Sequence, residues 1–293
     1  MAGFLQQVVE GLGAGAVYAS LALALVLIYQ FTGIVNFAQG ELAMFSAYVA
    51  WQAMAAGLPF WAALALTLAV SFAGGMLIER IVIRPVEGAP ELTLVIVTVG
   101  LFIFVNAAAG WIWTFLIKDF PNPFPRGALE VGGVSVGFST LGVLGVVALV
   151  MGLLYLLFQH TKIGLGMRAV AANPDSARLV GIRVGRTLAL GWGLAATVGA
   201  VSGVLVAPLL FLEPNMMGGV LIYAFAAATL GGFDSPAGAV AGGVIVGVAE
   251  TLAGAYVPAV GSDLKIGVPL AIILGVLLVR PRGLFGRAVV ERA

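Results

Sequence analysis

Residues 160–186 read HTKIGLGMRAVAANPDSARLVGIRVGR. This polar stretch is flanked on each side by an apolar run of about twenty residues, the length that crosses a bilayer. It carries five of the fourteen Lys and Arg residues of the chain, and its one acidic residue is Asp175. Basic residues beside membrane spans favour the cytoplasmic side, because Lys and Arg resist translocation. The stretch therefore predicts a cytoplasmic loop over residues 160–187 between two membrane spans.

A short helix is expected inside this loop. Asn173 can cap its N-terminus, Pro174 suits the first helical position, and Gly181 can end it. Its apolar surface, beside Arg178, would come from Ala177, Val180 and Ile182. Because a membrane protein gains little from a helix in its largest cytoplasmic loop unless something binds it, we expect this helix to dock a partner.

Composition indicates that the whole chain belongs to the membrane. Of its 293 residues, 61% are hydrophobic and 9% are charged, whereas a soluble domain carries about a quarter charged residues. The apolar runs are continuous rather than alternating, which excludes a transmembrane β-barrel. We therefore expect an all-α, polytopic membrane protein that forms a single transmembrane domain over residues 1–293. The net charge of +1 says little about partners, and nothing in the chain indicates nucleic-acid binding.

The apolar runs predict a bundle of nine transmembrane helices, with eight to ten allowed. A span needs about twenty apolar residues. The expected spans lie at about 5–29, 36–56, 60–80, 92–117, 139–159, 188–211, 216–232, 237–257 and 265–280. The run at 216–232 is short, which makes it a candidate for a re-entrant or broken helix.

The basic residues give this arrangement an orientation. Eleven of the fourteen fall on one side: Arg80 and Arg84, the five of the loop, and Arg280, Arg282, Arg287 and Arg292. The positive-inside rule makes that side cytoplasmic and places the N-terminus outside. A ten-span arrangement would instead place the N-terminus inside. The stretch 118–138, rich in Pro and Gly, is then expected to be an outward-facing loop.

Glycine is abundant, at 41 residues, and often recurs at a spacing of four. Such pairs are Gly11 and Gly15, Gly199 and Gly203, Gly238 and Gly242, and Gly243 and Gly247. In lipid, small residues at this spacing let helix backbones approach closely. We expect these pairs to mark tight helix contacts.

Several kinds of chemistry are excluded by the sequence. No G-x-x-x-x-G-K followed by Ser or Thr is present, so the chain lacks this phosphate-binding loop. The chain has no Cys and one His, His160, so disulfides, a thiol nucleophile and a Cys or His metal cluster are excluded, and no cofactor is expected. The chain has the bulk of a transporter without a visible source of energy, and we do not expect it to be an enzyme.

Polar residues inside the expected spans are candidates for a solute path. They are Asn36, Gln39, Glu41, Asn106 and Glu250. A carboxylate at the bilayer centre costs about 2.5–3.5 kcal/mol, so it faces protein or a water-filled path. Hydrogen bonding between helices is an alternative role for Asn106 and Glu250. Helix capping is an alternative role for the group from Asn36 to Glu41.

Four segments of the chain resemble the LivH-type permease subunits of branched-chain amino acid ABC importers. They are TGIVNFAQGELAMFSAY at 32–48, TKIGLGMRAVAANPDSARLVGIRV at 161–184, LGGFDSPAGAVAGG at 230–243 and RPRGLFG at 280–286. The resemblance covers nearly the whole length, and the segment 161–184 is its most specific part. Gln39 departs from the family, in which this position is often His, so a protonation role does not carry over to it.

This resemblance implies a passive permease subunit in a bacterial inner membrane, with a single permease domain. Its partners would be two ATPase subunits, a homologous second permease or a second copy of itself, and an extracytoplasmic binding protein that delivers leucine, isoleucine or valine. The segment 161–184 would seat the ATPases through a coupling helix. The residues expected there are Arg168, Asn173, Pro174, Asp175, Ala177, Arg178, Leu179 and Gly181.

A different class of function is also open at this point. A self-sufficient secondary transporter or channel for a small neutral solute could use broken spans and intramembrane Glu residues for ion coupling. Such a protein has no need of a long basic docking loop. The loop at 160–187 therefore favours the ABC permease.

Overall fold

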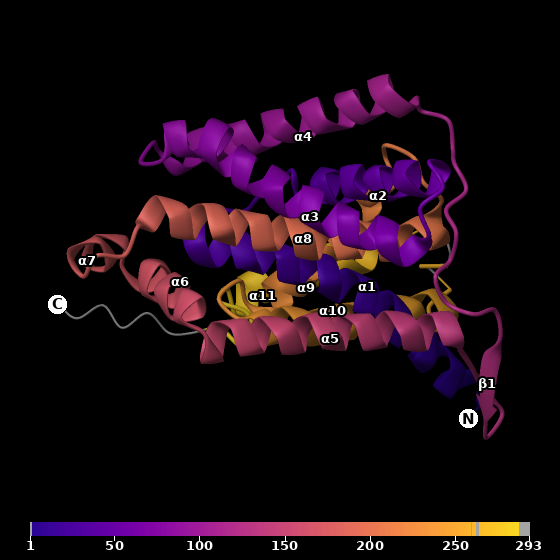
Figure 1. Cartoon of the computed structure of the whole chain (residues 1–293). Coiled ribbons are helices and arrows are strands. Elements are labelled where there is room, and N and C mark those ends of the chain that lie inside the picture. The colour runs from indigo at the N-terminus through magenta and orange to yellow at the C-terminus, as the bar shows by residue number, and fades with distance from the viewer. Residues whose placement is uncertain (1, 259, 262–263, 287–293) are drawn as a thin grey trace. The chain divides into compact units, whose positions relative to one another are not determined.

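The computed structural model describes residues 2–258, 260–261 and 264–286, and this part of the chain is almost entirely helical (Figure 1). Its α-helices are α1 (Ala2–Thr32), α2 (Gln39–Ala55), α3 (Phe60–Ile78), α4 (Glu91–Trp113), α5 (Phe138–His160), α6 (Lys162–Ala172), α7 (Pro174–Leu179), α8 (Val184–Leu210), α9 (Met217–Gly231), α10 (Pro236–Tyr256) and α11 (Gly267–Val279). A π-helical turn, η1 (Glu79–Ile83), and a 3₁₀ turn, η2 (Arg84–Val86), extend α3. Arg287 and Arg292 of the expected basic tail lie outside the described residues.

A helix forms at each of the nine segments where the sequence predicts a span. Within the described ranges, six helices have the length and apolar composition to cross a bilayer: α1, α3 with its extension, α4, α5, α8 and α10. The other three are shorter, with 17 residues in α2, 15 in α9 and 13 in α11. The all-α, polytopic prediction is confirmed, but the prediction of nine spans is not, because helix length supports six.

Two elements were not predicted from the sequence. The stretch expected to be an outward-facing loop contains a β-hairpin of β1 (Ala128–Val131) and β2 (Val134–Gly137). Gly132 and Gly133 join the strands with φ values of +60° and +79°, the left-handed backbone that a two-residue hairpin turn of this type needs. The second is helix α6, which lies in the first half of the segment that the sequence predicts to be a cytoplasmic loop.

The helices group into two compact units by their contacts. One unit contains Met1–Val26, Phe124–Val147 and Gly219–Ala293, and the other contains Leu27–Pro123 and Ala148–Gly218. We call them the α1/α10 unit and the α2/α8 unit after their principal helices. The unit boundaries fall inside α1, α5 and α9 and in the segment between α4 and β1. The sequence instead predicts one domain over the whole chain.

Helix α8 forms the centre of the α2/α8 unit. It packs against α2 and α3, and α2 also packs against α4. Gly203 of α8 lies so close to the backbone of Ala43 in α2 that a side chain at this glycine would overlap the Ala43 carbonyl. Gly75 of α3 lies in the same way against the backbone of Trp192. Small residues therefore set the separation of these three helices.

The α1/α10 unit follows the same rule. Gly11 and Gly15 of α1 lie against the backbone of α10 near Gly243 and Gly247. A side chain at Gly247 would overlap the backbone of Gly15. The prediction that these glycine pairs mark tight helix contacts is confirmed.

Candidate functional site

The segment predicted to be a cytoplasmic loop forms the short helix that the sequence predicts. The side-chain Oδ1 of Asn173 accepts a hydrogen bond from the Ser176 amide at 2.9 Å, which caps α7, and Pro174 is the first helical residue. Gly181 follows the helix with φ at +85°, a conformation that glycine adopts without strain. Local capping signals therefore fix both ends of α7 to within two residues.

Helix α6 precedes α7 and folds back against the end of α5. Thr161 caps it, since its Oγ1 accepts a hydrogen bond from the Gly164 amide at 3.0 Å. Gly164 lies against the backbone of Leu157 and Phe158, so a side chain at this position would block the chain reversal. The absence of a side chain at Gly164 thus lets α6 pack closely beside α5.

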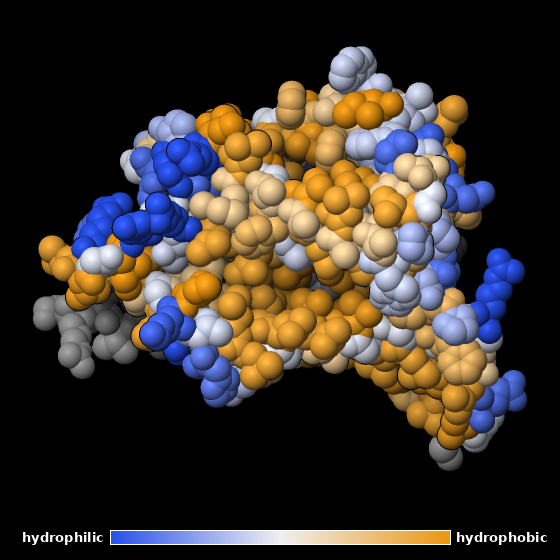
Figure 2. Space-filling view, in the orientation of Figure 1, coloured by the Kyte–Doolittle hydropathy of each residue, from blue (hydrophilic) through white to orange (hydrophobic). Residues whose placement is uncertain are grey.

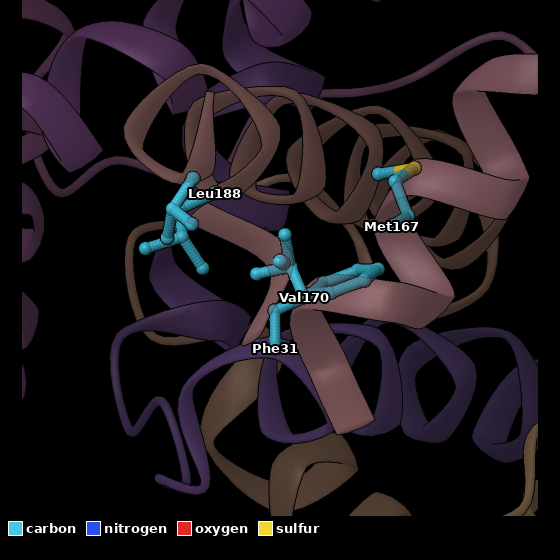
Figure 3. Close-up of a cluster of buried hydrophobic side chains, with 6 residues drawn as sticks. Phe31, Met167, Val170 and Leu188 are labelled. Carbon is cyan, nitrogen blue, oxygen red and sulfur yellow. The ribbon is translucent and has the colours of Figure 1, made fainter. Parts of the chain in front are cut away.

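The helices α6 and α7 are anchored by a buried hydrophobic cluster, which we call the seat. Its buried members are Phe31, Met167, Val170, Ala177, Val184 and Leu188. Figure 3 shows Met167 and Val170 of α6, Phe31 from the end of α1 and Leu188 of α8. Because the seat joins four helices of the α2/α8 unit, α6 and α7 cannot move far without displacing the start of α8.

Ala177 does not present its side chain to a partner as the sequence predicts. Its side chain is 3% exposed and belongs to the seat, while Ile182 is half-buried against the same cluster. The outward apolar surface comes from Leu179 and Val180, which are 89% and 75% exposed. Leu179 lies two positions after Ala177, on the opposite side of the helix, so it points outward when Ala177 points inward. Val180 is the residue that caps the C-terminus of α7, where the regular helix has ended.

Charged groups are exposed on the same two helices, α6 and α7. Arg178 forms an ion pair with Asp175 at 2.9 Å on the open surface of α7. Arg168 is exposed on α6 and donates a hydrogen bond to Gln159 Oε1 at 3.1 Å. In Figure 2, hydrophilic residues gather over the end where α6 and α7 lie. Bare aliphatic side chains within a charged rim are typical of a protein interface.

The intramembrane candidates Asn36 and Gln39 lie together at the start of α2. Asn36 Oδ1 accepts a hydrogen bond from the Ala38 amide at 3.0 Å, and its Nδ2 donates to Gln39 Oε1 at 3.2 Å. Gln39 Nε2 in turn donates to the carbonyl of Ala195 in α8 at 3.1 Å. Both side chains are fully buried. Asn36 therefore stabilises the turn before α2, and Gln39 ties that turn to α8.

The contact between Gln39 and Ala195 also shows where α2 begins. Ala195 lies near the middle of α8, which has 27 residues. Helix α2 therefore starts beside the middle of a membrane-spanning helix, and not at its end as the predicted span 36–56 implies. Irregular backbone at that depth is typical of transporters, in which broken helices place polar groups beside the solute path.

Glu41 and Asn106 form a second polar group in the same unit. Asn106 Nδ2 lies 3.2 Å from Glu41 Oε2, 2.9 Å from the Pro214 carbonyl and 3.2 Å from Asn215 Oδ1. An amide nitrogen has two hydrogens, so Asn106 cannot serve three acceptors fully at once. The group can therefore exchange partners. Asn215 was not predicted from the sequence. The one feature of the sequence that indicates it is the polar Glu-Pro-Asn run between two apolar segments.

Glu250 has a different environment, in the α1/α10 unit. Its two carboxylate oxygens accept hydrogen bonds from the hydroxyls of Tyr18, at 2.8 Å, and Tyr223, at 3.3 Å. The two tyrosine rings stack with their centroids 4.4 Å apart. Glu250 thus joins α1, α9 and α10, and the structure does not group it with the other four candidates.

Three buried polar atoms have no hydrogen-bond partner among the described residues. They are Tyr48 Oη, Trp192 Nε1 and Ser202 Oγ, on α2 and α8. Trp192 and Asn36 line the same small hollow, beside Thr32 and Thr98. Buried polar atoms nearly always have a hydrogen-bond partner, so these three atoms are positions at which a water molecule or another polar group can bind.

Comparison with known proteins gives full-length similarity. Residues 7–277 match the family described as branched-chain amino acid transport system / permease component. The chain is 33% identical over 303 residues to the high-affinity branched-chain amino acid transport system permease protein BraD of Pseudomonas aeruginosa, covering 99% of this chain and 98% of the relative. It is 32% identical over 303 residues to LivH of Escherichia coli, covering 99% and 97%. A probable LivH from Methanocaldococcus jannaschii is 30% identical over 283 residues, covering 91% and 87%.

Proposed function

Because the chain belongs to the family of branched-chain amino acid transport system permease components, we propose that it moves leucine, isoleucine or valine across the bacterial inner membrane. It acts as the permease subunit of an ABC importer. An extracytoplasmic binding protein delivers the amino acid, and two separate ATPase subunits supply the energy. The second half of the pore is a homologous permease or another copy of this chain. All nine apolar helices act as one permease domain.

The outward face of α7 is the observation that carries this proposal. Leu179 and Val180 are exposed beside the Asp175–Arg178 pair, and α7 is seated through Ala177 on the buried cluster beneath it. An ATPase that binds this face can push or pull α6 and α7 as one body. The seat then carries the displacement to α8.

Helix α8 is the element through which such a displacement reaches the solute path. Its N-terminus holds Val184 and Leu188 of the seat, and its middle holds Ala195, the partner of Gln39. A shift of α8 therefore changes the environment of Asn36 and Gln39. Glu41 can move with α2, because Asn106 can exchange its hydrogen bond to Glu41 for one to Pro214 or Asn215. ATP binding drives alternating access by favouring one arrangement of these contacts over the other.

Reconstitution in proteoliposomes tests the proposal directly. Uptake of radiolabelled leucine is measured for three preparations. They are the chain alone, the chain with the ATPases and second permease, and the full set with the binding protein. We expect uptake from the full set alone, and only with ATP on the ATPase side. Uptake by the chain alone, driven by a proton or sodium gradient, would instead establish a secondary transporter.

A further inference from the structure

A large hollow lies between the end of α3 and the start of α8, in the α2/α8 unit. Its volume is about 630 Å³, and Arg80, Arg84 and Arg186 line it. Arg84, after the end of α3, contacts Gly185 at the start of α8, and Gly75 of α3 lies against Trp192 further along α8. The two helices therefore run in opposite directions, and their arginines share one end of the pair. The proposed docking helix α7 directly precedes α8, so this is the cytoplasmic end.

The three arginines differ in what they contact. Arg84 forms a bidentate ion pair with Glu79, at 2.7 and 3.1 Å, and also donates to the Gly185 carbonyl at 2.6 Å. Arg80 and Arg186 are exposed and form no ion pair among the residues that the structure describes. Glu79 thus neutralises one of the three guanidinium groups, and the two without an ion pair leave the hollow positively charged. It is suited to an anion.

The rest of the hollow is apolar. Ala73, Met76 and Leu77 of α3 and Ala189 and Leu190 of α8 form its wall. Both helices are long and apolar enough to cross a bilayer, so this wall lies at the depth of the acyl chains and not in the cytosol. The hollow therefore combines a cationic mouth at the membrane surface with a hydrocarbon-like interior.

The wall continues into a stripe of exposed aliphatic side chains along α3. The stripe consists of Leu66, Val70 and Leu77 of α3 and Ile81 of its extension η1, which recur on one face. In a membrane, an exposed stripe of this kind contacts lipid tails. A lipid acyl chain that enters the hollow can therefore extend along α3.

We propose that this hollow binds an anionic phospholipid of the cytoplasmic leaflet, with its phosphate between Arg80 and Arg186 and an acyl chain against the wall at Leu77. Basic pockets between membrane helices on the cytoplasmic side suit anionic headgroups. Inorganic phosphate would satisfy the arginines and leave the apolar wall unused. A second permease molecule would cover the wall and leave both arginines without a counter-charge.

Lipid binding to the full chain in neutral detergent tests the proposal without requiring transport. Native mass spectrometry measures the affinity for phosphatidylglycerol and for phosphatidylcholine with the same acyl chains. The double variant Arg80→Gln/Arg186→Gln removes the charge of the hollow. Leu77→Trp narrows the hollow and keeps its charge, and Arg126→Gln is the matched control. Arg84 is left unchanged, because it holds Glu79 and α8 in place.

We expect phosphatidylglycerol to bind in preference to phosphatidylcholine. The double variant should lose roughly thirtyfold in affinity, since each basic residue near the surface contributes about 1 kcal/mol and tenfold is about 1.4 kcal/mol. Leu77→Trp should weaken binding as well, and Arg126→Gln should not. Equal affinity for the two lipids, an unaffected double variant or an unaffected Leu77→Trp would overturn the proposal. So would displacement of the lipid by millimolar inorganic phosphate or by the second permease subunit.

Discussion

At the scale of single residues, Glu250 is explained by its two tyrosine partners. Tyr18 and Tyr223 donate to its two oxygens, so the carboxylate is a junction between three helices. Glu250→Gln keeps one acceptor oxygen, and we expect leucine uptake near the unmodified level. Glu250→Leu leaves both hydroxyls unpaired, which should cost about 2–4 kcal/mol of stability. Uptake in proteoliposomes and thermal unfolding in detergent measure the two effects, with Tyr223→Phe as the control that removes one bond.

An opposite result for Glu250 would have a clear meaning. If Glu250→Gln abolished uptake while the unfolding temperature stayed the same, the carboxylate would be needed for transport and not for holding the helices together. Its place would then be on the solute path, as one of the two interpretations of the sequence allows.

Asn106 is expected to behave differently, because it belongs to the group that can exchange partners. Asn106→Leu removes the donor to Glu41 and leaves the buried carboxylate without its described partner. We expect a loss of about 1–3 kcal/mol of stability and a large loss of uptake. Adding Glu41→Met should recover stability, since replacing both polar partners removes the unpaired group. Uptake should remain lost in the double variant, and its recovery would show that the pair is only structural.

The kinds of residue at these sites could be predicted from the sequence, but their partners could not. Rare polar side chains in apolar runs are visible in a sequence because their insertion is costly. That Gln39 contacts α8, or that Tyr18 and Tyr223 share Glu250, depends on helices far apart in the chain. Tyr48, Trp192 and Ser202 gave no signal, because Tyr, Trp and Ser are ordinary residues of membrane helices.

At the scale of elements, α7 allows the docking face to be separated from the seat beneath it. Leu179→Asp places a charge on the exposed face, so it should weaken ATPase co-purification at least tenfold and leave the unfolding temperature unchanged. Ala177→Asp buries a charge in the seat, so it should destabilise the chain itself by about 3 kcal/mol or more. Leu129→Asp, on the exposed strand β1, is the matched control for an exposed leucine. Normal ATPase binding by Leu179→Asp would contradict docking at this face.

The glycine contacts give a second prediction for elements. A methyl group at Gly247 would overlap the backbone of Gly15, so Gly247→Ala should force α1 and α10 apart and cost about 1–3 kcal/mol. Gly100 of α4 has nothing near the position of an added Cβ, so Gly100→Ala should be neutral or stabilise the helix by up to about 1 kcal/mol. Thermal unfolding in one detergent compares the two. Equal effects would show that the close approach does not limit stability.

Local signals explain which elements the sequence could predict. The cap at Asn173, the proline after it and the glycine at 181 are read within one segment, so α7 was placed correctly. Helix α6 carries Gly164 and Gly166, which lower helix propensity, and its formation depends on the seat. The start of α2 was placed a few residues early, because an apolar run does not reveal that the chain turns beside the middle of α8.

At the scale of the whole molecule, composition was sufficient for the class of protein, but not for the grouping of its helices. A chain with 9% charged residues cannot form a soluble domain of this size, whatever its order of elements. The division into two units joins segments from the beginning, middle and end of the chain, and no local pattern encodes it.

Labelling of introduced cysteines can determine the orientation and the parity of the crossings, because the natural chain has no Cys. Asp175→Cys on α7 and Glu130→Cys on β1 replace two exposed acidic residues. With a membrane-impermeant maleimide, we expect Glu130→Cys to react in intact cells and Asp175→Cys to react only in inverted vesicles. Reaction of Asp175→Cys in intact cells would contradict docking to cytoplasmic ATPases.

Gly3→Cys then tests whether α2 completes a crossing. Five apolar helices, α1 to α5, separate residue 3 from residue 175. If all five cross, the two positions lie on opposite sides, and Gly3→Cys should react in intact cells, as the nine-span orientation predicts. If α2 enters and leaves on one side, four crossings remain and Gly3→Cys should react only in inverted vesicles. Of these five helices, α2 is the shortest, with 17 residues, and it begins beside the middle of α8. The side on which Gly3→Cys reacts therefore shows whether α2 crosses the membrane.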